Sequence, residues 1–224
     1  MSNHEAQVKP GTGSAIDRYY EDYWQAPEDY HDPTAPQRQA LWRRHLAALP
    51  SDAAVLDVGC GDGGFCAFFK SLGYDVRGID ISRRAVDYAR RRHPDISFDV
   101  RLIEDEAAEH ATTYDCVFSS EVIEHLFDVG GYLQAINRAL KPGGLLVLTT
   151  PYHGLIKNLT IDLFNYAGHY DPLGQHIRFF DRKSLGRCLT RFGFEPTVWT
   201  AYGRPSPLWK SFFVVSRKVR EAEE

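Results

Sequence analysis

A glycine-rich segment between a predicted strand and a predicted helix constrains the fold of this chain more than any other feature. Ala53–Val58 is a short apolar strand, and it runs directly into Gly59-Cys60-Gly61-Asp62-Gly63-Gly64. Apolar residues then recur at helical spacing as far as Gly73. A tight glycine turn from a buried strand into a helix is typical of α/β folds that bind nucleotides.

The same alternation of strand and helix continues along the chain. After a first helix from about Gln37 to Pro50, helices are expected from Ser82 to Pro94, over Gly131–Leu140 and over Asp181–Phe192. Further strands are expected at Asp75–Ile81, Ser97–Ile103, Tyr114–Ser119, Leu145–Thr149, 194–202 and 208–216. These elements predict an α/β fold with a doubly wound, mainly parallel seven-stranded sheet.

Two segments depart from this alternation. Residues 1–36 are expected to form an N-terminal tail and an aromatic lid segment, before a domain over 37–224. Residues 151–180, rich in His, Tyr, Gly and Pro, are expected to be an insertion on the substrate side of the sheet. Within it, 155–164 has the spacing of an amphipathic helix, for which a lid over the pocket is favoured above a dimer contact or a membrane contact.

Composition excludes several classes of protein. The 224 residues suit one large domain, and the formal net charge of −4 argues against a nucleic-acid partner. The four cysteines are scattered without metal-ligand spacing, and no stretch of 18 apolar residues is present. We therefore expect a reduced, cytoplasmic protein without stable membrane insertion, and a homodimer is possible.

The charge of the glycine loop bears on which nucleotide it binds. Gly59-x-Gly61-x-x-Gly64 fits the dinucleotide fingerprint, but Asp57 and Asp62 would repel a pyrophosphate. S-adenosylmethionine has no phosphate and carries a sulfonium and an ammonium, so it suits this loop better. Asp80 lies 21 residues after Gly59, where a carboxylate can accept hydrogen bonds from ribose hydroxyls of either ligand.

Four ordered motifs carry a resemblance to a known family. VLDVGCGDGG (55–64), GIDIS (78–82), SSEVIEH (119–125) and LKPGGLLVLTTP (140–151) resemble class I S-adenosylmethionine-dependent methyltransferases. SSEVIEH and the stretch 102–110 look most like the ubiquinone-biosynthesis O-methyltransferases and their relatives. The resemblance implies a Rossmann-like methyltransferase fold and carries over Arg38, Gly59, Asp80 and Ser120 as cofactor contacts. Together with neighbours in the loop and at the strand ends, the candidate contacts are Arg38, Asp57, Gly59, Cys60, Gly61, Asp80, Ile81, Glu104, Asp105, Ser119 and Ser120.

An acid–histidine cluster follows the fourth predicted strand. Glu121, Glu124 and His125 are spaced so that they can share one helical face, and the resemblance implies that they hold Mg2+. Methyl transfer to a hydroxyl also needs a base, which a histidine provides near neutral pH. The candidate catalytic bases are His125, His153 and His176, and His125 is available only if no metal binds it.

These features predict transfer of a methyl group from S-adenosylmethionine to a small molecule, with oxygen as the favoured acceptor atom: a quinol, phenol, sugar or natural product. N- or C-methylation of a small molecule is an alternative. Methylation of amides is disfavoured, since Ser119–Val122 stands where those enzymes carry [Asn/Asp]-Pro-Pro-aromatic. A non-catalytic regulatory subunit that binds S-adenosylmethionine and an NAD-dependent oxidoreductase are the rival interpretations.

Overall fold

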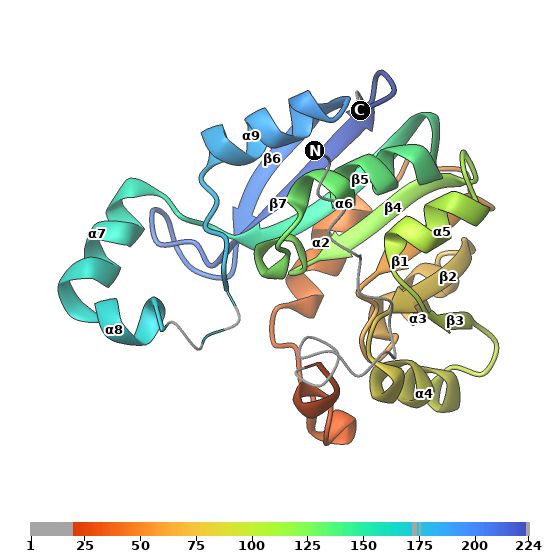
Figure 1. Cartoon of the computed structure of the whole chain (residues 1–224), viewed down its shortest axis with the longest axis horizontal. Helices are drawn as coiled ribbons and strands as arrows, with labels where there is room; N and C mark the ends of the chain where they lie inside the picture. Colours follow the sequence, from red (N-terminus) through yellow and green to blue (C-terminus); the bar gives the residue numbers. More distant parts are fainter. Residues whose placement is uncertain (1–19, 172–173, 175, 223–224) are drawn as a thin grey trace, which may run out of the picture.

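Seven strands form one sheet in the order β3-β2-β1-β4-β5-β7-β6, with helices on both faces (Figure 1). The structure is a computed structural model and describes residues 20–171, 174 and 176–222. The strands β1 to β5 are parallel, whereas β7 is antiparallel to both β5 and β6. The bounds are β1 Ala54–Val58, β2 Asp75–Asp80, β3 Ser97–Val100, β4 Tyr114–Ser120, β5 Leu140–Pro151, β6 Phe194–Tyr202 and β7 Ser211–Lys218. The predicted doubly wound, mainly parallel Rossmann-like sheet is confirmed.

Two hydrophobic layers hold the helices to the sheet. The helices α2 (Ala35–His45), α3 (Gly64–Ser71) and α4 (Arg83–Arg92) bury their apolar side chains against one face. The helices α5 (Ile103–Glu109), α6 (Val129–Ala139) and α9 (Arg182–Arg191) cover the other face. Neighbouring residues of β1 show the alternation, because Val55 lies in the first layer and Leu56 in the second. A strand buried on both faces reads as a continuous apolar run.

The largest differences from the predicted strand boundaries lie in the third, fifth and last strands. The third strand ends at Val100, and α5 begins at Ile103 within the segment predicted as strand. The stretch 103–109 is rich in Glu and Ala, which favour helix, and its short length hid the periodicity. The fifth strand begins at Leu140, and the last runs over Ser211–Lys218 instead of 208–216.

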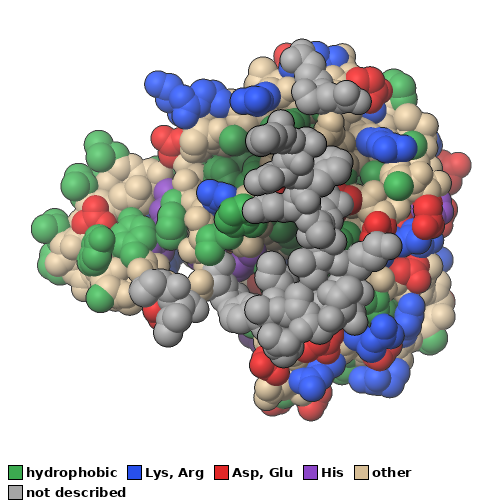
Figure 2. All heavy atoms as spheres, in the orientation of Figure 1, with side chains coloured by type: hydrophobic (Ala, Val, Ile, Leu, Met, Phe, Trp, Pro, Cys, Tyr) green, Lys and Arg blue, Asp and Glu red, His purple; other side chains and the backbone are tan. Residues whose placement is uncertain are grey.

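The segment after β5 carries α7 (Leu155–Phe164) and α8 (Tyr166–His169), which project sideways from the sheet (Figure 1). The predicted amphipathic helix is therefore present, although that this segment is an insertion stays a prediction. Hydrophobic side chains gather on this arm in Figure 2, and Leu155, Leu163 and Phe164 are each at least three-quarters exposed. No helix in the described ranges has the length and apolar character needed to cross a membrane.

Candidate functional site

A cavity of about 1070 Å³ opens at the carboxyl ends of β1, β2 and β4, the edge where α/β folds bind ligands. The glycine loop, the end of β2 and the segment after β4 line it on the sheet side. Residues 20–39 contribute most of a further wall. None of the residues of α7 lines the cavity, so the predicted lid does not cover it in this structure.

Glycine is required at the loop for two reasons. Gly59, Gly61 and Gly63 have φ angles of 75°, 51° and 77°, a region that side chains rarely adopt. A Cβ atom on Gly59 would also lie 2.6 Å from Cγ2 of Val122. The amides of Gly59 and Cys60 both donate to the carbonyl of Ile79, which ties the loop to β2. Gly59, Cys60, Gly61 and Ile81, all predicted cofactor contacts, line the cavity.

Asp80 ends β2 beside this loop, buried but facing the cavity. Its Oδ2 accepts from the amide of Gly61 at 3.0 Å and its Oδ1 from the amide of Ser82 at 2.9 Å. Burial raises the pKa of Asp80 above its ordinary value, and the backbone donors oppose that shift. Each carboxylate oxygen retains a lone pair for a ligand hydroxyl.

Asp57 lies at the end of β1, fully buried beneath the loop. Its Oδ2 accepts from the thiol of Cys66 at 3.3 Å, and burial raises its pKa to about 7. A cationic ligand in the cavity would favour the ionised carboxylate. Burial likewise raises the pKa of Cys60 to about 11, so this thiol is protonated at neutral pH. Asp62 pairs with Arg92, so part of the loop's negative charge is already balanced.

Arg38 extends from α2 into the cavity and is only 4% exposed. Its Nη1 donates to Oγ of Ser120, its Nη2 pairs with Asp32, and its guanidinium lies 4.8 Å from the ring centroid of Phe65. Its Nε is buried and has no hydrogen-bond partner in the described part of the chain. An unfilled buried donor is costly, so a ligand acceptor is expected there.

Of three other predicted cofactor contacts, one lines the cavity and two do not. Glu104 lines the cavity from the first turn of α5, where burial raises its pKa. Asp105, one residue further along α5, is exposed and does not line the cavity. Ser119 does not line it either, because its hydroxyl is buried against the hydroxyl of Tyr132 at 2.8 Å. The arrangement therefore favours Glu104 over Asp105, and Ser120 over Ser119.

The carboxylate of Glu121 is hydrogen-bonded to side chains of β5, β6 and β7. It accepts hydrogen bonds from hydroxyls of Thr149, Tyr202 and Ser211 at 2.8 to 3.2 Å. Its φ of 56° is unusual for a side chain of this size and turns the chain sharply after β4. Glu121 is thus not grouped with Glu124 and His125 as the spacing predicted.

Instead, the structure groups Glu124 and His125 with His176. Glu124 and His125 belong to the short helix η2 (Ile123–His125), and the carbonyl of Glu124 accepts from the amides of Ile177 and Arg178. One potential ligand atom from each of Glu124, His125 and His176 lies within 4.8 Å of the other two. Glu124 Oε1 is buried and lacks a hydrogen-bond partner among the described residues, and burial raises the pKa of Glu124 well above its usual range. His176 is exposed to solvent on one side, and desolvation by its neighbours, with the nearby His125, His169 and Lys157, lowers its pKa to about 4.

His153, the third predicted base, lies outside the cavity. Its Nδ1 is 3.1 Å from Oδ1 of Asn158, and its ring packs on His169 and Phe179. Burial lowers its pKa to about 4. His125 and His176, with ring centroids 5.0 Å apart at the cavity wall, are better placed than His153 to meet a substrate.

The N-terminal aromatic residues also belong to the site. Tyr20, Tyr23 and Trp24 line the cavity, whereas Tyr19 lies outside the described residues. Trp24 packs on Tyr30 with ring centroids 4.8 Å apart. Sequence reasoning missed several lining residues whose place depends on the tertiary fold: Tyr30, His31, Asp32, Arg101, Phe127, Tyr132 and Lys210.

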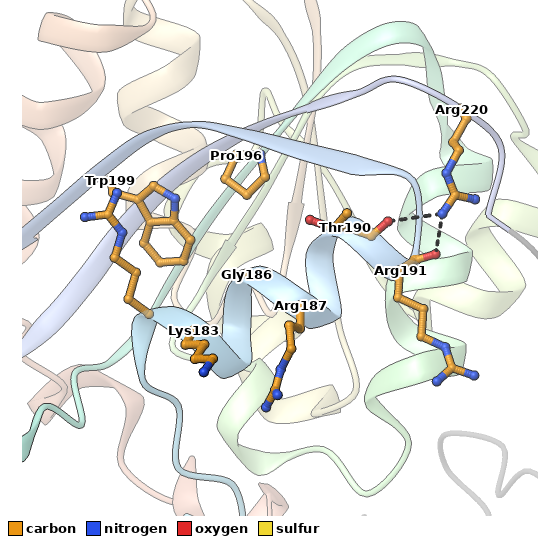
Figure 3. Close-up of a pocket in the computed structure, with 9 residues that line it drawn as sticks. Lys183, Gly186, Arg187, Thr190, Arg191, Pro196, Trp199 and Arg220 are labelled. Atoms are coloured by element: carbon orange, nitrogen blue, oxygen red, sulfur yellow. Dashed lines mark hydrogen bonds between the residues drawn. The ribbon is translucent and has the colours of Figure 1, made fainter.

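A second hollow lies on α9 and β6 and contains none of the predicted site residues (Figure 3). Basic side chains of α9 surround the hollow, and Trp199 and Pro196 of β6 line it. Arg220 donates to the carbonyls of Thr190 and Arg191 at the end of that helix. The cavity at the glycine loop, which carries the predicted chemistry, is therefore the candidate active site.

Comparisons with known proteins identify the family of the chain. A family model described as a methyltransferase domain matches residues 34–198. The ubiquinone biosynthesis O-methyltransferase of Methylocella silvestris is 30% identical over 208 residues, which cover 82% of this chain and 81% of that relative. The protein of the same name from Xanthomonas axonopodis is 38% identical over 105 residues, a match that spans only 44% of its length.

The fold is also found in solved structures. The 1,6-didemethyltoxoflavin-N1-methyltransferase of Burkholderia thailandensis, with bound 1,6-didemethyltoxoflavin and S-adenosylhomocysteine, superposes with a TM-score of 0.67. The match covers 92% of this chain and 86% of that chain at 19% identity. At this identity the likeness establishes the fold alone.

Proposed function

The chain belongs to the methyltransferase domain family, and on this premise we propose that its glycine-loop cavity binds S-adenosylmethionine and that its product is an O-methylated small molecule. The observation that carries the proposal is the meeting of the glycine loop, Asp57 and Asp80 at one wall of a single cavity. The relatives named O-methyltransferases support oxygen as the acceptor atom. A quinol, phenol, sugar or natural-product hydroxyl fits this reaction class.

Each part of this wall has a partner on the donor. The loop glycines let the ligand approach the backbone closely, and Asp80 is positioned to accept from the ribose hydroxyls. Glu104 is placed to accept from the adenine amino group. The carboxylate of Asp57, with its raised pKa, is stabilised in its ionised form by a cation above the loop.

The donor, when bound, supplies a methyl group already activated by its sulfonium. The chain's own residues hold the acceptor in line with that carbon and remove its proton. His125 and His176 both line the cavity, and the lowered pKa of His176 keeps its imidazole neutral and able to accept the hydroxyl proton. Trp24 and Tyr30, which pack on each other in the cavity wall, would shield a bound donor from water.

The same histidines are also candidate ligands for a divalent cation. Glu124 Oε1, which is buried, accepts no hydrogen bond from the described residues and lies 3.8 Å from His125 Nε2, fits such an ion beside His125 and His176. One carboxylate with two imidazoles suits zinc or a similar transition metal better than Mg2+, which prefers oxygen ligands. Glu124, His125 and His176 would hold the ion, which would supply Lewis-acid activation of the acceptor oxygen. His125 and His176 would then be ligands rather than bases.

The function is tested by supplying the protein with S-adenosylmethionine labelled in its methyl group. Panels of phenols, catechols, sugars and matched amines serve as acceptors. Label that is transferred to the hydroxyl compounds and to no other acceptor supports the proposal. Label found exclusively on nitrogen or carbon would replace the oxygen assignment, and cofactor binding without any transfer would favour a regulatory subunit.

A further inference from the structure

Three cations of α9 lie on one side of that helix, away from the candidate active site. Lys183, Arg187 and Arg191 are spaced four residues apart, so they are neighbours along the helix surface. All three are exposed, and Figure 3 shows them pointing to the same side of α9. We call these three side chains the α9 basic face. Together with Arg182 and Arg220 they border the hollow of about 750 Å³ on α9 and β6.

The positive charge of the α9 basic face is not balanced from within the described part of the chain. No ion pair joins its three side chains to a described carboxylate, whereas Arg92 of α4, which is also exposed, pairs with Asp62. Asp181 precedes the helix, and its carboxylate caps the backbone there instead. The face therefore has three cations available to an anion from outside the chain.

This arrangement of cations does not stabilise α9. Like charges four residues apart on a helix repel each other, and Lys183 lies in the first turn, where the helix dipole disfavours a cation. The helix is held to the sheet by Leu185 and Leu189, which are fully buried in the core. Because the cations oppose the stability of the helix, a contact outside the chain is the better explanation of their alignment.

The surroundings of the face indicate which kind of anion fits it. Trp199 packs on Phe212, and the guanidinium of Arg182 lies 5.3 Å from its ring centroid, so this ring is already engaged and is not offered to a nucleic-acid base. Five of the 26 basic side chains border the hollow, so 21 remain elsewhere against 30 acidic ones, a balance that repels a long polyanion.

A membrane surface fits the face no better. None of the large apolar side chains that are exposed in the described ranges belongs to α9 or β6, so nothing here would insert between lipids. A short acidic segment of a protein needs neither a stacking ring nor an apolar anchor. It is therefore the anionic partner that this face suits best.

We propose that the α9 basic face is a docking site for an acidic helix of a partner protein, whose carboxylates pair with Lys183, Arg187 and Arg191. A helix with carboxylates four residues apart matches the spacing of the three cations, because both rows follow the same helical pitch. Arginine can meet a carboxylate through two parallel hydrogen bonds, which favours a defined register. The face lies outside the glycine-loop cavity, so the inference goes beyond the proposed function and does not depend on it.

The test measures binding of a synthetic helical peptide to the full chain. The peptide carries Glu at three positions spaced four residues apart, and a matched peptide carries Gln at the same positions. A short single-stranded RNA and vesicles of phosphatidylglycerol are the competing ligands. Thermal unfolding of each variant shows that it is folded.

Two triple variants differ only in where three exposed cations are removed. The α9 variant combines Lys183→Gln, Arg187→Gln and Arg191→Gln. The control variant removes three exposed arginines that line neither the hollow nor the glycine-loop cavity, and combines Arg44→Gln, Arg83→Gln and Arg91→Gln. Both variants change the net charge of the chain by the same amount.

Wild type is expected to bind the Glu peptide about 10-fold more tightly than the Gln peptide, as three exposed ion pairs predict. The α9 variant loses this preference, and the control variant keeps it. Added salt weakens binding of the Glu peptide to wild type, because exposed charges are screened. The unfolding temperature of the α9 variant is no lower than that of wild type, since removing like charges relieves their repulsion.

Four results would overturn the inference. Equal losses of peptide binding in the two variants would mean that only net charge acts, and a lower unfolding temperature in the α9 variant alone would mean that the cations stabilise the fold. Tighter binding of the RNA or the vesicles than of the Glu peptide, lost in the α9 variant, would assign the face to a nucleic acid or a membrane. A wild type that binds both peptides equally has no such docking site.

Discussion

The indole of Trp24 packs directly on Gly61, so that a Cβ atom on Gly61 would lie 2.7 Å from Cζ2 of Trp24. The contact joins the N-terminal aromatic segment to the glycine loop across the candidate active site. Gly61 also donates its amide to Asp80 and has a φ of 51°. Backbone conformation, loop closure and the aromatic wall thus all depend on the absence of a side chain at this position.

Gly61→Ala is therefore expected to weaken binding of S-adenosylhomocysteine. A methyl group there must displace Trp24 or the loop, and strained positions of this kind cost about 1–3 kcal/mol. The corresponding loss of affinity is roughly 10-fold or more. Gly143→Ala is the matched control, because Gly143 also has a positive φ but its Cβ would meet no atom within 4 Å. Titration calorimetry that gave equal losses for both variants would contradict the role assigned to the Trp24 contact.

His176→Ala is expected to lower kcat by about 100-fold or more while leaving the affinity for S-adenosylhomocysteine unchanged, as removal of a general base does. His153→Ala removes a buried ring outside the cavity, so it should lower the unfolding temperature and leave kcat near the wild-type value. Steady-state kinetics and thermal unfolding separate the two. A larger kcat loss in His153→Ala than in His176→Ala would reverse the ranking of the bases.

The pH dependence of kcat follows from the same group. Because the pKa of His176 is lowered to about 4, the imidazole is deprotonated and active above that value. The contribution of this base should rise as pH increases through about 4 and stay flat from roughly pH 5 upward. A sigmoidal rise centred near the ordinary histidine pKa, absent in His176→Ala, would show that burial does not shift this group.

Metal content distinguishes the two sets of candidate ligands. Protein loaded with Zn2+ or Co2+ and then dialysed should retain about one equivalent of the ion, whereas Mg2+ should not compete at equal concentration. The role of His176 as a base applies to the metal-free protein, because in the loaded protein His125 and His176 would be ligands. Glu124→Gln should abolish retention, and Glu121→Gln, whose carboxylate is bound to three hydroxyls, should not. Elemental analysis provides the measurement. Retention lost only in Glu121→Gln would restore the grouping that the sequence spacing predicted.

Glu106 is expected to stabilise the fold through a buried ionic cluster. It is fully buried on α5 and accepts from Tyr114, Arg101 and Arg77, whose other carboxylate partners, Glu109 for Arg101 and Asp99 for Arg77, are much less buried. Glu106→Gln should cost about 1–3 kcal/mol in denaturant unfolding, as loss of buried hydrogen bonds to charged groups does, whereas the exposed Glu109→Gln, which also pairs with Arg101, should cost at most about 1 kcal/mol. Similar costs for both variants would mean that the cluster contributes no more than a surface pair.

The pKa of Glu106 gives the sign of the pH effect. Its hydrogen bonds to Tyr114 and Arg101 outweigh desolvation and lower its pKa below the ordinary value of 4.5. The stabilisation is therefore complete above the unfolded-state pKa and is lost as pH falls through the folded-state value. The difference in unfolding free energy between wild type and Glu106→Gln should shrink below about pH 4.5, where the carboxyl also protonates in wild type. A difference that grew in acid would contradict this assignment.

Much of the fold and the cofactor side of the site follows from local sequence patterns. The glycine loop and Asp80 were predictable because each directly follows or ends a parallel strand. The carboxyl ends of parallel strands lie at the same edge of the sheet. The β1 strand was recognisable because burial on both faces makes it a nearly continuous apolar run.

The remaining features depend on contacts between distant segments. His176 reaches His125 only because residues 177–178 bond to the carbonyl of Glu124, which no spacing reveals. The place of Asp32 depends on a turn that orients it toward Arg38. The short helix α5 was not predicted, because it begins at Ile103, the last residue of the predicted third strand, and with it the different positions of Glu104 and Asp105 were missed.

Calorimetric titration with S-adenosylmethionine, S-adenosylhomocysteine and NAD tests most directly whether this cavity binds S-adenosylmethionine through Asp80. Wild type should bind the first two ligands and not NAD. Asp80→Ala should weaken both by about 1–3 kcal/mol, and Asp80→Asn by less, as loss of a charged hydrogen bond requires. Asp105→Ala, outside the cavity, should bind as wild type does. Binding of NAD, or equal affinities in wild type and Asp80→Ala, would contradict the account.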